Sequence, residues 1–146
     1  MTKELVQSSL KCKYPHCESY ICLPIFASAE TVRGKVQWPQ IFVCNECHNA
    51  FSYSEDDLCS RLVHPVGLEF LRNSKVWGKH VECSAATCKI RIKVLFVSEP
   101  ERLVEHFVQS APCPNCKRTL KLGLSTVPTV DHDWDVLRKS FGPPAK

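Results

Sequence analysis

Eight of the ten cysteines occur in closely spaced pairs, and the order of these pairs is repeated along the chain. In each copy, a pair with four residues between its cysteines is followed by a pair with two residues between them. Deprotonated cysteine sulfurs are soft ligands, and two such pairs can surround a zinc ion in a tetrahedron. The pattern therefore predicts two zinc ions, each held by four cysteines. The predicted ligands are Cys12, Cys17, Cys44 and Cys47 for the first site, and Cys83, Cys88, Cys113 and Cys116 for the second.

Two alternatives are compatible with the same spacing. Iron also accepts a tetrahedron of sulfurs, and an iron site would indicate electron transfer. The pairs could also be joined crosswise, the first with the third and the second with the fourth. Sequential pairing is favoured because each copy contains one pair of each kind, with a helix-like segment between the copies. Disulfides are disfavoured because the spacings are typical of metal ligands and the N-terminal residues lack the apolar core of a signal peptide.

The arrangement resembles the zinc ribbon, a rubredoxin-like family with four cysteine ligands, present as a tandem pair over most of residues 10–124. Two features differ from the usual pattern. The first pair of each copy has four intervening residues instead of two, and Glu18, His48, Lys89 and Lys117 stand where the family usually has glycine. The resemblance implies a small metal-stabilised α+β fold, mostly β, with two tandem zinc ribbons and short helices between and after them.

The repeat divides the 146 residues into two units. We expect residues 1–73 to contain ribbon 1 and a following helix, and residues 74–146 to contain ribbon 2, an inserted helix and a C-terminal tail. Units of this size bury little apolar surface, and a structural metal is a common source of additional stability. The hydrophobic content of 44% is that of a globular chain.

Apolar patterning predicts the elements around the cysteines. We expect strands at residues 20–26, 41–43, 50–53, 90–97 and 119–122. A loop or hairpin is expected over residues 27–40. Helices are expected after Ser54, ending at Pro65, and from about 99 to 109. A short helix in the tail should dock through Trp134 and Leu137.

Positive charge is concentrated in the second half of the chain. Residues 1–73 contain 7 Lys and Arg against 8 Asp and Glu, whereas residues 74–146 contain 12 against 7. Alternation along the expected strands places two groups of cations on their outer faces. If both strands belong to one sheet, the combined surface could contact phosphates or an acidic protein, and a solvated sheet face is the alternative. The residues are Lys89, Arg91, Lys93, Lys117 and Lys121.

Three further residues have two interpretations each. Trp38, in the loop before the second cysteine pair, is our candidate for a contact with another protein, with core packing as the alternative. Cys22 and Cys59 lie outside the repeat. We expect them to be small buried hydrophobic residues, and a redox pair or a reactive thiol is the alternative.

These observations favour a non-catalytic role. The sequence has no three-ligand metal motif, no Ser-His-Asp arrangement and no phosphate-binding glycine loop. No run of about 18 apolar residues exists, so no membrane span is expected, and we expect a cytoplasmic or other reducing compartment. The leading hypothesis is an adaptor that binds another protein and contains two structural zinc ions. The alternatives are a nucleic-acid-binding regulator and a rubredoxin-like iron electron carrier.

Overall fold

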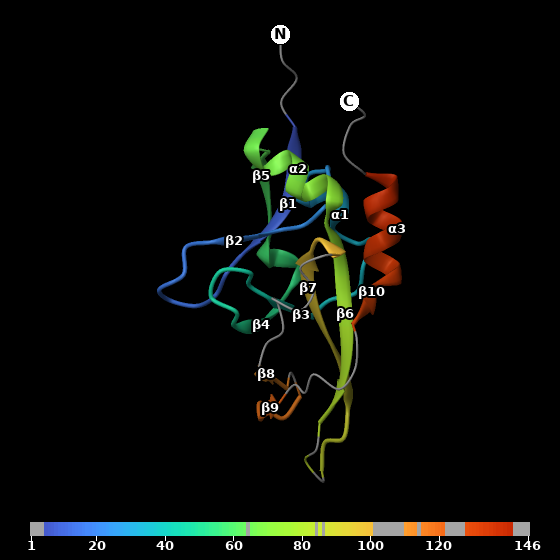
Figure 1. Cartoon of the computed structure of the whole chain (residues 1–146). Coiled ribbons are helices and arrows are strands. Elements are labelled where there is room, and N and C mark those ends of the chain that lie inside the picture. Colours follow the sequence, from blue (N-terminus) through green and yellow to red (C-terminus); the bar gives the residue numbers. More distant parts are fainter. Residues whose placement is uncertain are drawn as a thin grey trace.

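The computed structural model describes residues 5–63, 65–83, 85, 87–100, 110–113, 115–121 and 128–141. This part of the chain is mostly β, with short helices (Figure 1). The strands are β1 (Val6–Lys11), β2 (Tyr20–Cys22), β3 (Gln40–Val43), β4 (Ala50–Tyr53), β5 (Leu58–Leu62), β6 (Lys75–Glu82), β7 (Arg91–Ser98), β8 (Ser110–Pro112), β9 (Thr119–Lys121) and β10 (Thr129–Val130). The helices are α1 (Ala29–Val32), the 3-10 helix η1 (Glu55–Asp57), α2 (Pro65–Asn73) and α3 (His132–Ser140).

The strands form three sheets. A three-stranded sheet has the order β2-β1-β5, a five-stranded sheet has the order β10-β6-β7-β3-β4, and β8 pairs with β9. The five-stranded sheet contains strands from both halves of the sequence. They meet where β3 lies parallel to β7, with Ile41 opposite Val94 and Phe42 opposite Leu95. The division at residue 73 stays a prediction, but the two halves share this sheet.

Alternating side chains on β3 and β7 contribute to two separate apolar clusters. The first cluster contains Phe42 and Leu95 and also includes the core residues of the three-stranded sheet and of α3. The second contains Ile41 and Val94 and lies on the opposite face. Ile92 and Phe96 lie on the same face of β7 as Val94 and belong to the second cluster as well.

Helix α3 closes the first cluster. Asp131 is its N-cap and accepts a hydrogen bond from the Trp134 amide at 3.0 Å. The Trp134 side chain is fully buried, and its indole nitrogen donates to Gln40 Oε1 at 2.8 Å. Leu137 is also buried, so docking of the tail through Trp134 and Leu137 is confirmed.

The predicted helix after Ser54 is wrong. Ser54 and Asp57 do form a capping box, but it begins only the three-residue helix η1. The chain then extends as β5, whose residues pair with β1 from Leu58 opposite Leu10 to Leu62 opposite Val6. This pairing outweighs the local helical pattern. Pro65 begins α2 instead of ending a helix, in agreement with the tolerance of proline in a first helical turn.

Other boundaries also differ from expectation. The strand expected over residues 20–26 ends at Cys22, and Leu23 and Ile25 then make irregular backbone hydrogen bonds with Ser8. The expected loop over residues 27–40 contains α1. The helix expected at 99–109 lies almost wholly outside the described residues. The strands expected at 41–43, 50–53, 90–97 and 119–122 are confirmed to within one residue at each end.

Candidate metal centres

Each of the four cysteine pairs lies in the turn between two antiparallel strands. These turns join β1 to β2, β3 to β4, β6 to β7, and β8 to β9. The same hydrogen bond closes all four: the amide of the first cysteine donates to the carbonyl two residues after the second. The bonds are Cys12 to Ser19 at 3.0 Å, Cys44 to Asn49 at 3.0 Å, Cys83 to Ile90 at 2.9 Å and Cys113 to Arg118 at 2.8 Å. A short loop between paired strands thus holds both sulfurs on one side of the turn.

The residue that follows the second cysteine adopts a left-handed backbone conformation in three of these turns. The φ angles are 60° at His48, 49° at Lys89 and 66° at Lys117. Glycine adopts this conformation without steric cost, and a residue with a side chain does not. These are three of the four positions at which the zinc-ribbon family usually has glycine. The backbone bend is therefore made here by residues with a side chain.

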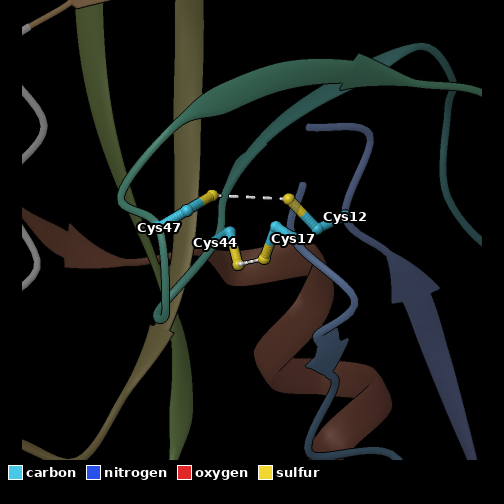
Figure 2. A group of neighbouring side chains, drawn as sticks. All are labelled: Cys12, Cys17, Cys44 and Cys47. Carbon is cyan, nitrogen blue, oxygen red and sulfur yellow. Dashed lines mark hydrogen bonds between the residues drawn. The ribbon is translucent and has the colours of Figure 1, made fainter. Parts of the chain in front are cut away.

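The first site brings together the sulfurs of Cys12, Cys17, Cys44 and Cys47, which all lie within 4.8 Å of one another. The Sγ atoms of Cys12 and Cys47 are 3.5 Å apart, and those of Cys17 and Cys44 are 3.8 Å apart. Figure 2 shows the four side chains pointing toward one another from the two turns.

The second site repeats this arrangement with Cys83, Cys88, Cys113 and Cys116. The sulfurs of Cys83 and Cys116 are 3.6 Å apart, and those of Cys88 and Cys113 are 3.7 Å apart. With zinc–sulfur bonds of about 2.3 Å, two corners of a tetrahedron are about 3.8 Å apart. The spacing of the sulfurs thus fits a tetrahedral ion in both sites, and the two quartets are those predicted by sequential pairing.

The two sites differ in exposure. In each site the first cysteine of each turn is buried: Cys12 and Cys44 in one, Cys83 and Cys113 in the other. Cys17, Cys47 and Cys88 are half-buried, whereas Cys116 is exposed. The buried sulfurs belong to the two apolar clusters, the first site to one and the second site to the other. An ion at either site would therefore hold a turn against a hydrophobic core.

The sulfurs differ in acidity within each site. Hydrogen bonds from the Asn115 side chain and the Ile90 amide lower the pKa of Cys88 to about 6. The Ser19 amide is the main cause that lowers the pKa of Cys17 to about 7.

Their partners hold protons more tightly. Burial raises the pKa of Cys12, and it also raises the pKa of Cys44. At Cys83 the Ala85 amide favours the thiolate, but burial and hydrogen bonds shared with the other three cysteines raise the pKa to about 12. A metal ion must displace these protons to bind, so acid should weaken binding at both sites.

Lys13 lies inside the first turn, and its side chain contacts strand β4. Its ammonium donates to the Ser52 carbonyl at 2.6 Å, lies 5.0 Å from the centre of the Tyr53 ring and forms an ion pair with Asp57 at 3.1 Å. Partial burial opposes ionisation of Asp57, but the Ser54 amide and Lys13 hold its pKa below the usual range. These contacts could not be predicted from the sequence, because the pairing of β1 with β5 is what brings Asp57 near the turn.

The five predicted cations do not lie on one sheet. Lys93 belongs to β7 of the five-stranded sheet, whereas Lys121 belongs to β9 of the two-stranded sheet. The combined basic surface was expected only if both strands belonged to one sheet, and they do not. Lys93 forms an ion pair with the buried carboxylate of Asp131. Lys89, Arg91 and Lys117 are exposed.

Trp38 and the two unassigned cysteines take the following places. Trp38 is half-buried and packs edge-on against Trp134, with ring centres 5.9 Å apart. Cys22 and Cys59 are half-buried and lie opposite Ser9 from the two strands that flank β1. Two strand spacings separate their backbones by about 10 Å, which is beyond the reach of a disulfide. They were expected to be buried and are only half-buried, and a direct disulfide between them does not fit this fold.

Comparison with protein-family models finds no match, and neither curated proteins nor solved structures give one. None of the described helices has the length and apolar character needed to span a membrane. The described residues contain two groups of side chains that could hold a metal ion, and both are cysteine quartets.

Proposed function

We propose that this chain is a non-catalytic adaptor in which two zinc ions, each bound by four cysteines in a zinc-ribbon-like arrangement, hold the fold that another protein recognises. The observation that carries the proposal is the convergence of four sulfurs at each site. A shell of four protein ligands leaves no position for a substrate or an activated water, which is the difference between structural and catalytic zinc sites. The placement of buried sulfurs within both apolar clusters supports the same role.

Metal analysis of the purified protein tests the first part of the proposal. We expect two zinc ions per chain, a colourless solution and loss of cooperative unfolding after chelation. Iron in the same shell would give a coloured protein and would replace the adaptor by an electron carrier. A protein without bound metal that keeps its fold would reject both.

The adaptor role is tested by affinity capture from the source organism with the zinc-loaded chain as bait. The expected result is a protein retained equally with and without nuclease treatment. A bait in which Cys44 and Cys113 are both replaced by serine should lose the partner, because both sites are then incomplete. Capture of nucleic acid alone would contradict the adaptor role.

Nucleic-acid binding is a second candidate because Lys89, Arg91 and Lys117 are exposed around the second site. Its expected signature is an affinity that falls steeply with salt, because each phosphate contact releases counterions. Affinity for oligonucleotides that does not change with salt, or no binding at all, would remove this candidate.

A further inference from the structure

Strand β7 has an open edge beside the second metal centre. On one side, β6 pairs with it along its whole length, from Glu82 opposite Arg91 to Lys75 opposite Ser98. On the other side, among the described residues, β3 pairs only beside Val94 and Leu95. Within the described part of the chain, β7 therefore continues toward Arg91 with no β partner on that side. Backbone groups on such an edge are available to a further strand.

A groove of about 350 Å³ lies along this edge. Its β7 wall includes side chains from both faces of the strand, Ile90 and Ile92 on one and Arg91 and Lys93 on the other. This mixture of faces means that the groove opens onto the edge of the strand. The opposite wall is made by the segment 37–40 before and at the start of β3, together with Ser52 of β4.

We propose that this groove binds an extended acidic peptide segment of a partner protein, which adds to β7 as a short strand. The proposal rests on the adaptor function and specifies its partner. Residues opposite each other on paired strands share a face of the sheet. Partner residues opposite Arg91 and Lys93 should thus be acidic, and the residue between them, opposite Ile92, should be apolar. The recognised pattern is acidic–apolar–acidic.

The charges around the groove favour this pattern. Arg91 is exposed, and the half-buried Lys93 also reaches Asp131. Exposed Lys89 precedes the strand. On β6, partial loss of solvent lowers the pKa of His80, and the positive charges of Arg91 and Lys93 lower it further. Two acidic groups oppose the cations: Glu82 lies across from Arg91 on β6, and Asp133 of α3 lines the groove.

The apolar residue of the peptide pattern would contact an apolar surface beside the groove. Ile92 belongs to the second apolar cluster, and half-buried Ile90 packs against that cluster. An aliphatic side chain placed opposite Ile92 would extend the cluster into the groove. The Ile90 carbonyl accepts the hydrogen bond that closes the Cys83–Cys88 turn, so the second metal site fixes the end of the binding edge.

The test uses the zinc-loaded chain and a fluorescent synthetic peptide with the core glutamate–valine–glutamate. We expect saturable binding, with hydrogen exchange slowed at the amides of residues 91–93. A glutamine–valine–glutamine peptide should bind at least about tenfold more weakly because it lacks charge. A peptide N-methylated at all three core residues should also bind at least about tenfold more weakly, because it cannot donate backbone hydrogen bonds.

Protein variants locate the site. Arg91→Gln should weaken binding by about tenfold or more. The matched control is Lys35→Gln, which removes an exposed cation outside the groove and should leave affinity unchanged. Ser52→Trp fills the groove without changing the charge of the protein and should abolish peptide binding.

Three results would overturn the proposal: no saturable binding, equal affinity of the Arg91→Gln and wild-type chains, or equal affinity of the N-methylated and unmodified peptides. Full displacement of the peptide by an oligonucleotide, with no change in amide exchange, would instead assign the groove to phosphates. If a captured partner binds wild-type and Arg91→Gln chains alike, the adaptor role stands and this groove is excluded as its site.

Discussion

At the scale of single residues, the left-handed position that follows three of the four cysteine pairs has a measurable energetic cost. Lys117 occupies it with φ of 66°. We expect Lys117→Gly to be more stable than Lys117→Ala by about 1 kcal/mol, because glycine alone avoids the clash of Cβ in this conformation. Chemical denaturation with zinc held constant measures the difference.

The alanine variant is the proper reference because it also removes the charge. At an ordinary position the order would be the opposite, since glycine gains more chain entropy on unfolding. Equal stability of the two variants would contradict the left-handed conformation at this residue.

The exposure of Cys116 predicts unequal metal release from the two sites. Cys116 is an exposed residue, whereas none of the four cysteines of the first site is exposed. A chelator can attack the accessible ligand first, so we expect two phases of zinc release, with the faster phase from the second site. A coloured zinc indicator measures both phases. Cys116→Ser should remove the fast phase and Cys47→Ser the slow one, and the reverse assignment would refute this interpretation.

At the scale of elements, Asp131 joins α3 to the central sheet by three contacts. Its carboxylate caps the helix and pairs with Lys93, and its amide donates to the Val76 carbonyl at 2.9 Å. We expect Asp131→Ala to destabilise the protein by about 2–3 kcal/mol, because the cap and the ion pair of a buried carboxylate are lost together. Asp131→Asn should cost less because an amide can still cap.

Urea unfolding of the zinc-loaded protein measures these changes. Asp133→Ala is the matched control, because Asp133 lies in the same helical turn but is exposed. Its expected cost is below about 1 kcal/mol. A cost for Asp131→Ala no larger than that of the control would show that the cap and ion pair contribute little.

The same elements show what the sequence could predict. The two cysteine quartets followed from spacing alone, because a tetrahedral site needs pairs of sulfurs on short turns. Trp134 and Leu137 were recognisable because their spacing places both on one helix face. Segment 58–62 was misassigned because Leu58 and Leu62 also have helical spacing. Its pairing with β1, which begins far away at Val6, decides the outcome.

The groove and the separation of the cations were beyond local reasoning. Both depend on β3 lying parallel to β7, a contact between residues about fifty positions apart. Alternation placed Arg91 and Lys93 on one face of their strand, but it could not show that the adjacent edge is open. It also could not show that Lys117 and Lys121 belong to a different sheet.

At the scale of the whole molecule, the shared sheet predicts that the two halves depend on each other. Residues 1–73 alone would lack β7 beside β3 and the fully buried Trp134. We expect this fragment to show no cooperative unfolding even with zinc, because its core would be open to solvent. Nuclear magnetic resonance of the fragment, alone and mixed with residues 74–146, measures this. A well-dispersed spectrum of the fragment alone would establish residues 1–73 as an autonomous unit.

The position of Trp134 also affects the order of folding during synthesis. The other members of its apolar cluster come mainly from the first sixty residues of the chain, yet the cluster is complete only after the ribosome has added residue 134. Until then the nascent chain exposes an incomplete core, the state in which chains tend to aggregate or bind chaperones. Early capture of zinc by Cys12, Cys17, Cys44 and Cys47 would hold the first two turns together during this interval.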